Sequence, residues 1–160
     1  MLRDDRRIER TRQGDFRLRL PRSERDLLRR LPAELQELLA AAPEDPSLRR
    51  LFPPAYEDAD DEAEYRRLMG DELAAGRLRA LQVLEETADR DRLSAAEAQA
   101  WLTALNDLRL ALGTRLDVEE GTLLDGLDPR DPRAPELAVY AYLSWLEEQL
   151  VAALSAGLPD

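Results

Sequence analysis

A leucine-rich segment in the second half of the chain contains the polar residues whose types and spacing could do chemistry. Residues 101–116 carry leucines every three or four positions, which is the pattern of one face of an amphipathic helix. Asn106 and Arg109 are one turn apart in that helix and share a face beside the leucines. Polar groups so close to a core need partners, because burying a neutral one alone costs roughly 2–7 kcal/mol. We therefore predict a structural polar network composed of Glu64, Asn106, Asp107, Arg109 and Arg115.

Arg109 is the member of this network with the most definite expected surroundings. We expect its side chain to be largely buried and paired with an acid, and Glu64 on the preceding long helix is the first choice. The alternative is that these polar residues form a recognition spot for a partner. The melting temperature of an Arg109→Ala variant separates the two, since the loss of a buried pair would lower it strongly.

The composition gives little support to catalysis. The 160 residues contain no histidine, cysteine or lysine, which removes the commonest nucleophiles, general bases and transition-metal ligands. No phosphate-binding or dinucleotide-binding glycine motif is present. The acidic run at residues 57–62 lacks the glycine and the alternating ligands of a calcium loop, so acids at the start of a helix explain it better. We expect no catalytic, cofactor-binding or metal site, and a carboxylate-dependent enzyme is the least favoured function.

The elements that must position these residues are mostly helices, because apolar residues recur at helical spacing along the chain. Ser23 is the expected N-cap of the first helix, and Pro32 should kink or split that helix. Ser94 and Glu97 form a capping box before the third helix. Gly76, on the apolar face of the second helix, should let two helices approach closely. The prediction is a mainly α single domain over residues 1–160, with a bundle of four principal helices (23–42, 61–88, 94–116, 135–156), an N-terminal β-hairpin (7–20) and a long acidic loop (117–134).

The charge of the chain is unevenly distributed. The net charge is −11, yet residues 1–30 carry eleven arginines against six acids, a local charge of +5. Alternation of arginines with Phe16, Leu18 and Leu20 predicts a hairpin with its arginines outward. This basic region could face nucleic-acid phosphates or an acidic protein, or its arginines could simply protect a solvated sheet edge. The candidate nucleic-acid or partner contacts are Arg10, Arg12, Arg17 and Arg19.

The last helix is apolar over much of its circumference, so it is either central or in contact with two partners. Tyr142 and Trp145 lie beside its leucine stripe, and aromatic side chains commonly anchor interfaces. Two interpretations remain open, namely that these rings belong to the core or that they form a surface for a partner. A homodimer would cover them together with the apolar face of the hairpin, although the hairpin could instead pack on its own chain.

Three segments of the chain resemble a known family. They are Leu105–Leu116 (LNDLRLALGTRL), Arg50–Tyr56 (RLFPPAY) followed by Glu64–Arg66, and Tyr140–Leu150 (YAYLSWLEEQL). Their order and spacing are similar to those of the actinobacterial AosR-like family, long catalogued as a domain of unknown function. The resemblance implies an oxidative-stress transcriptional regulator. Such a sensor would most simply use thiols, but this chain has no cysteine and therefore no route to direct thiol–disulfide sensing.

These features favour a non-enzymatic regulatory protein that acts through protein–protein contacts, and the resemblance implies the transcription machinery as its partner. Direct DNA binding through the arginine-rich hairpin is the alternative. The N-terminus lacks the apolar segment of a secretory signal, and no run approaches the roughly 20 apolar residues that span a bilayer. We therefore expect a cytoplasmic protein without membrane contact.

Overall fold

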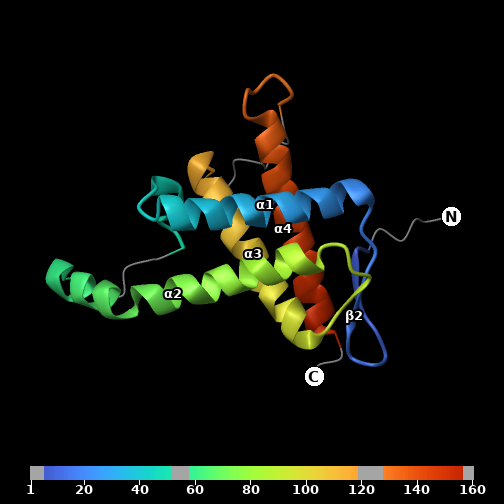
Figure 1. Cartoon of the computed structure of the whole chain (residues 1–160). Coiled ribbons are helices and arrows are strands. Elements are labelled where there is room, and N and C mark those ends of the chain that lie inside the picture. Colours follow the sequence, from blue (N-terminus) through green and yellow to red (C-terminus); the bar gives the residue numbers. More distant parts are fainter. Residues whose placement is uncertain (1–5, 52–57, 119–127, 157–160) are drawn as a thin grey trace.

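In the residues that the computed structural model describes, 6–51, 58–118 and 128–156, four long helices and a small antiparallel sheet make up the fold (Figure 1). The predicted mainly α fold with an N-terminal hairpin is confirmed. The helices begin and end within two residues of their predicted bounds. The elements are β1 (Ile8–Arg10), β2 (Phe16–Leu18), α1 (Arg22–Ala41), the 3-10 turn η1 (Pro46–Leu48), α2 (Ala59–Thr87), β3 (Arg92–Leu93), α3 (Ala95–Arg115) and α4 (Ala134–Ser155).

The sheet contains a strand that the sequence did not predict. β1 and β2 form the expected hairpin, in which Ile8 pairs with Leu18 and Arg10 with Phe16, and Gly14 turns the chain at a φ of +90°. β3 pairs with the other side of β2, and its two residues are too few to show an alternating pattern. Ile8, Phe16 and Leu18 are buried, so helices of the same chain cover the apolar face of the hairpin.

The helix starts agree with the sequence at α3 and differ from it at α1. Ser94 Oγ accepts a hydrogen bond from the Glu97 amide at 3.1 Å, and the Ser94 amide donates to the Glu97 carboxylate at 2.8 Å, as the predicted capping box requires. The N-cap predicted at Ser23 is wrong, because the extended backbone of Pro21 leads directly into the helix and places Ser23 inside its first turn. Pro32 lies within one continuous helix, so the predicted split does not occur.

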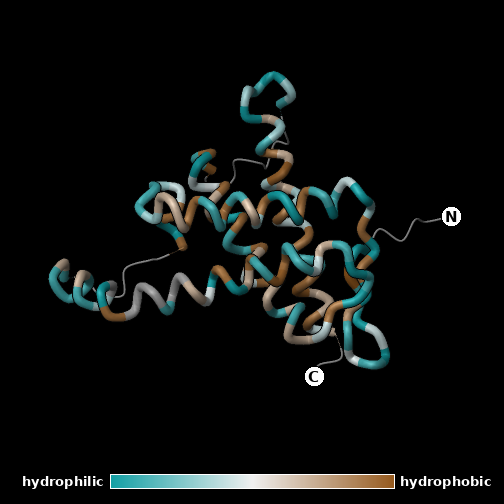
Figure 2. The backbone as a smooth tube through the Cα atoms, viewed as in Figure 1, coloured by the Kyte–Doolittle hydropathy of each residue, from teal (hydrophilic) through white to brown (hydrophobic). Residues whose placement is uncertain are grey.

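The central helix of the bundle is α3. It contacts α1, α2, α4 and η1, and Figure 2 shows apolar residues gathered where the helices cross. Trp101 is fully buried, and its indole nitrogen donates to Thr87 Oγ1 at 2.7 Å. The Thr87 hydroxyl in turn donates to the carbonyl of Val83 at 2.6 Å, so this buried polar chain is satisfied. Because α3 has neighbours on several sides, its polar residues face different helices.

Close approach of α3 and α4 depends on a glycine. A Cβ atom at Gly113 would lie 3.0 Å from Cε2 of Tyr140 on α4, which is tighter than normal contact. The close approach predicted for Gly76 is wrong, since a Cβ atom there would lie 3.8 Å from the Arg79 guanidinium, an ordinary contact distance. Both glycines lie within helices, so only their neighbours distinguish them.

The predicted acidic loop 117–134 has both of its ends fixed on the bundle, while residues 119–127 lie outside the described residues. Leu116, Val118 and Leu137 form a small second apolar cluster. Arg133 Nη1 donates to the carbonyl of Leu116 at 2.6 Å. The chain therefore leaves α3 and enters α4 at neighbouring points.

Candidate functional site

Asp107 of α3 faces α2 and is a deeply buried carboxylate. Its side chain is 1% exposed and forms an ion pair with Arg77 of α2 through Oδ1. Among the described residues, Oδ2 has no hydrogen-bond partner. Burial outweighs the attraction of Arg77 and raises the pKa of Asp107 above its ordinary value. Helical spacing placed Asp107 near the core, but nothing in the sequence identified Arg77 as its partner.

Arg109 lies on the side of α3 that faces α4. Nη2 donates to Asn106 Oδ1 at 2.9 Å, and Nε lies 2.9 Å from Glu147 Oε2 on α4. The arginine side chain is 31% exposed, so it is half-buried and not largely buried as expected. The predicted pair with Glu64 is wrong, because Glu64 is exposed on α2 and lies 3.8 Å from Arg67 of the same helix. Both α2 and α4 carry acids, and only the packing selects between them.

Arg115 lies at the C-terminal end of α3, apart from the other predicted members of the network. Its Nη2 atom is 2.7 Å from Glu136 Oε2 on α4, and both side chains are exposed. The predicted network is therefore a set of separate contacts that involve α2, α3 and α4. Of the five predicted residues, the structure brings Asn106 and Arg109 together and distributes the others among different partners.

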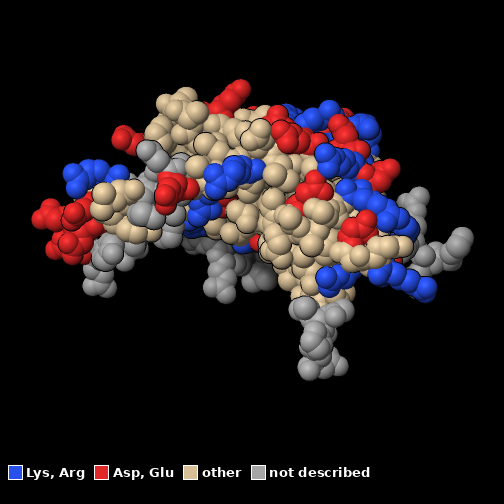
Figure 3. Space-filling model, turned by 60° about the horizontal axis from the view of Figure 1, so that its bottom comes forward, with Lys and Arg blue, Asp and Glu red and all other residues tan. Residues whose placement is uncertain are grey.

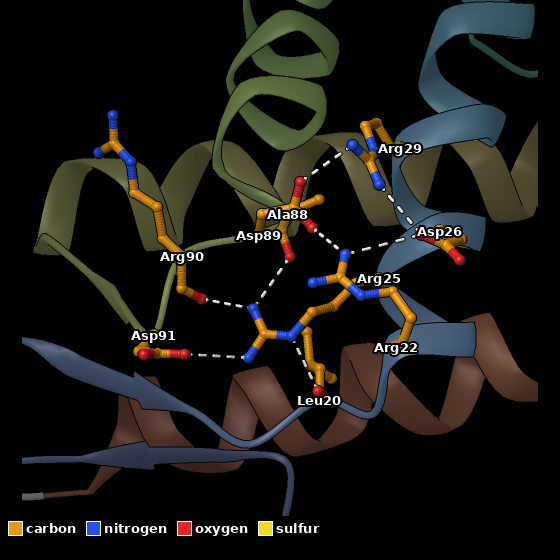
Figure 4. Close-up of polar contacts among 9 residues, drawn as sticks. All are labelled: Leu20, Arg22, Arg25, Asp26, Arg29, Ala88, Asp89, Arg90 and Asp91. Carbon is orange, nitrogen blue, oxygen red and sulfur yellow. Dashed lines mark hydrogen bonds and ion pairs between the residues drawn. The ribbon is translucent and has the colours of Figure 1, made fainter.

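A buried arginine that carried no sequence signal joins the sheet to the helices (Figure 4). Arg25 of α1 donates from Nε to the Leu20 carbonyl at 2.8 Å and from Nη1 to the carbonyls of Ala88 and Arg90 at 3.1 and 2.7 Å. Its Nη2 atom lies 3.3 Å from the Asp91 carboxylate. Most of these acceptors are backbone groups, which no pattern of side chains reveals. Arg25 thereby satisfies carbonyls that follow the end of α2, where a cation is favourable.

Salt bridges surround Arg25 at the surface (Figure 4). The Asp89 carboxylate lies 2.6 Å from Arg22 and 3.0 Å from Arg29. Asp26 contacts the same two arginines at 3.7 and 3.0 Å. The hydrogen bond from Arg22 holds the pKa of Asp89 below its ordinary value. The arginines at the start of α1 are therefore neutralised by acids of the same chain.

Two of the four hairpin arginines predicted to contact nucleic acid or a partner are engaged within the chain. The Arg10 guanidinium lies 5.5 Å from the centre of the Phe16 ring and donates to the carbonyl of Ala156. Arg19 lies 3.4 Å from the carboxylate of Glu9. Arg10 therefore links the hairpin to the end of α4, and Arg19 pairs with an acid of the opposite strand.

The other two hairpin arginines, Arg12 and Arg17, are exposed, and neither has an ion-pair partner in the part of the chain that the structure describes. Figure 3 shows basic and acidic residues side by side at the end that carries the hairpin, and a cluster of acids at the N-terminal tip of α2. A continuous basic surface is not visible on this face. The arginines behind the local charge of +5 counted from the sequence are thus interspersed on this surface with acidic side chains.

The two aromatic residues predicted to form an interface contact each other and their own chain. The ring centroids of Tyr142 and Trp145 are 6.1 Å apart. The Arg7 guanidinium lies 5.3 Å from the centre of the Trp145 ring, and its Nε is 3.2 Å from Glu24. The pKa of the Tyr142 phenol is raised above its ordinary value, mainly by burial and secondly by the neighbouring Glu24. Both rings are partly buried against the main core, so intramolecular packing accounts for much of their surface.

A cavity of about 240 Å³ opens between the second half of α1, η1, α3 and α4. Its polar lining residues are Glu34, Ser47 and Arg115, and the Ser47 hydroxyl donates to the Asp45 carboxylate at 2.6 Å. The α3 wall is formed by positions 108, 111, 112 and 115, which share one helical face within the segment 105–116. The apolar lining residues are Leu31, Leu35, Leu38, Leu108, Ala111, Leu112 and Leu143.

The side chains around this cavity suit binding better than acid–base chemistry. The described residues contain no group of three or more acidic, histidine or cysteine side chains that could hold a metal ion. No helix among them combines the length and the apolar character needed to cross a bilayer. The buried carboxylate of Asp107 is engaged with Arg77 and does not line the cavity.

The fold and this cavity define a small, mainly α-helical protein with an apolar site on its central helix. The family model described as "Domain of unknown function (DUF2017)" matches residues 5–154. The chain therefore belongs to the DUF2017 family.

The chain is also similar to curated proteins. The AosR protein of Mycobacterium leprae is 37% identical over 135 residues, which are 73% of this chain and 62% of that protein. The proteins named "Oxidative stress regulator AosR" in Mycobacterium bovis and Mycobacterium tuberculosis are 37% identical over 134 residues, or 72% of this chain and 61% of theirs. The chain thus spans less than two thirds of the length of these relatives. No solved structure matches it.

Proposed function

We propose that this protein is a non-enzymatic regulator of the oxidative-stress response that acts in the cytoplasm by binding another protein. The names of the AosR relatives support the regulatory role. The observation that carries the binding role is the apolar cavity on α3. The α3 residues that line it all lie within 105–116, the segment that resembles the AosR-like family. Apolar pockets of this kind commonly receive the anchor residues of a partner.

The absence of cysteine determines what kind of regulator this chain can be. None of its 160 residues can form a disulfide or a sulfenic acid on cysteine. An oxidative signal carried by thiols must therefore come from outside these residues. We propose that the partner supplies the signal, and that a component of the transcription machinery is the partner.

The regulatory role is tested by deleting the gene in the source organism and comparing transcripts before and after a peroxide pulse. We expect a defined set of transcripts to lose its peroxide response and to regain it when the wild-type chain is restored. Unchanged transcripts in the deletion strain would contradict the regulatory role. A pull-down of the tagged chain before and after peroxide then identifies proteins whose binding changes with oxidation.

Direct DNA binding is the second candidate, and the exposed Arg12 and Arg17 are the observation that favours it. Fluorescence anisotropy with duplex DNA at ~50 mM salt tests it, because phosphate contacts weaken steeply as salt rises. The double variant Arg12→Glu/Arg17→Glu should then lose binding, whereas Arg130→Glu, far along the chain from the hairpin, should retain it. Absence of binding for the wild type would remove this candidate.

The homodimer expected from the sequence stays a proposal. The hairpin residues that needed cover, such as Phe16 and Leu18, are buried within one chain. The remaining apolar surface of α4 includes the exposed Val151, and Tyr142 and Trp145 elsewhere on this helix are only partly buried. Light scattering coupled to size exclusion measures the mass, and a value of twice 18.2 kDa would support the dimer.

A further inference from the structure

We propose that the cavity between α1, η1, α3 and α4 receives a single large apolar side chain from a basic segment of a partner protein. This inference rests on the proposed function, since it specifies the chemistry of the protein partner. It commits to one occupant, a leucine-sized or aromatic side chain with arginine or lysine beside it. The argument uses the size of the cavity, the character of its walls and the charges at its mouth.

The size of the cavity fits one side chain. Its volume of about 240 Å³ lies below the range of roughly 300–1,000 Å³ that is typical of pockets for drug-sized ligands. It is nevertheless many times the roughly 30 Å³ that one water molecule occupies in the liquid. At protein interfaces, single aromatic side chains commonly serve as anchors in well-packed pockets.

Most of the residues that line the cavity are apolar. Leu143 of α4 is fully buried, and Leu108 and Ala111 of α3 are nearly so. Leu31 of α1 and Leu112 of α3 are only partly buried, which leaves apolar surface at the opening. The occupant therefore gains by transferring apolar surface out of water, about 25 cal/mol for each Å² removed.

Three acids and two arginines lie at the mouth of the cavity or next to the charged residues that line it. Arg115 lies near three carboxylates. Glu136 is 2.7 Å away, and Glu34 lies on the same rim of the cavity. The third is Asp45, whose pKa is lowered mainly by hydrogen bonds from Ser47 and also by the charge of Arg115. Arg30 offsets part of the charge of Glu34 at 3.7 Å. Acids thus outnumber bases around the opening, so a basic segment is complementary to it.

The proposal is tested with three blocked tripeptides and NMR of the isotopically labelled full chain. The probes are acetyl-Arg-Phe-Arg-amide, acetyl-Arg-Ala-Arg-amide and acetyl-Glu-Phe-Glu-amide. We expect the first to shift the methyl signals of Leu35, Ala111 and Leu143, and the second to leave them unchanged. The third should bind about two- to fivefold more weakly than the first, because the charges at the rim are exposed.

Several outcomes would overturn the proposal. Equal binding of the arginine and glutamate peptides would remove the preference for a basic partner. Equal shifts with neutral 2-phenylethanol alone, at the same concentration, would favour a small apolar molecule. Shifts that depend on protein concentration without any peptide would favour a second copy of the chain.

Variants at the rim locate the effect without disturbing the core. Glu34→Arg changes an exposed residue at the mouth and should weaken binding of the Arg-Phe-Arg peptide about two- to fivefold. Glu37→Arg makes the same charge change on an exposed position of α1 that does not line the cavity, and it should have little effect. Equal effects of both variants would contradict recognition at the mouth. Because these measurements use purified protein, their failure is distinct from a failure of the peroxide experiment in cells.

Discussion

At the end of the bundle that carries the sheet, the buried Arg25 donates hydrogen bonds to three backbone carbonyls. Further along the same helices, a largely apolar cavity opens between them. Both arrangements involve α1, where Arg25 lies near the start and Leu35 lies further along. Around Arg25, donors and acceptors are matched within the chain. Around Leu35, the helices leave a cavity of about 240 Å³.

This difference separates a structural region from a binding region within one bundle. A buried cation with all its partners inside the chain offers little to a ligand, since any new contact must displace an existing one. An apolar cavity gains from an occupant, because its walls lack neighbours on one side. The contacts of Arg25 therefore fix the fold at the sheet end, and the cavity beside Leu35 is the candidate for recognition.

The largest expected effect compares two leucines of α1 that differ in these surroundings. Leu28 is 0% exposed in the main core, and Leu35 is 5% exposed and borders the cavity. We expect Leu28→Ala to lower the free energy of unfolding by about 4 kcal/mol and Leu35→Ala by about 2 kcal/mol, because Leu35 has fewer contacts to lose. Urea denaturation measures both values. Equal losses would mean that the cavity end is packed as tightly as the sheet end.

The second prediction tests whether Arg25 holds the sheet end together. Replacement by alanine leaves the carbonyls of Leu20, Ala88 and Arg90 without their donor. We expect Arg25→Ala to cost about 3 kcal/mol of unfolding free energy, since each unsatisfied buried acceptor carries a penalty. Arg12→Ala, which removes an exposed arginine of the hairpin, is the matched control and should leave the urea midpoint unchanged. If Arg25→Ala lowered the unfolding free energy only slightly, Arg25 would not be the residue that stabilises the sheet end.

The third prediction concerns Arg109, which lies between the two ends on α3. Arg109→Ala removes a half-buried contact to Glu147 and should cost about 1 kcal/mol, less than a fully buried pair. Arg130→Ala, at an exposed position, serves as the control. A double-mutant cycle with Glu147→Ala should show coupling, while a cycle with Glu64→Ala should show none. Coupling to Glu64 would overturn the assignment of the partner.

The smallest expected effect is the pH dependence contributed by Asp107. Its pKa in the folded protein is raised above the ordinary 3.8, so the folded state binds a proton more readily than the unfolded state. The stability that this proton provides is fully present below pH 3.8 and decreases as the pH rises through the raised pKa. Relative to Asp107→Asn, the wild type should therefore lose stability as the pH rises through this range. Urea denaturation between pH 4 and 7 measures the difference, and a relative gain by the wild type would contradict it.

The sequence by itself determined the elements whose causes are local. Leucines at helical spacing predicted the four long helices, and the Ser94–Glu97 capping box marked the start of α3 because both partners lie within one turn. Gly14 and the alternating apolar residues after it predicted the hairpin for the same reason. The pairing of Asn106 with Arg109 also follows from spacing on a single helix.

Only the tertiary structure decided which groups meet across elements. Arg25 binds carbonyls that every residue possesses, so no side-chain pattern marks its partners. Arg109 had acids available on two helices, and the packing of α4 against α3 selected Glu147. The cavity is a property of the space between four elements and of no single one of them. Local chemistry acts over a few residues of sequence, whereas these contacts depend on how the helices cross.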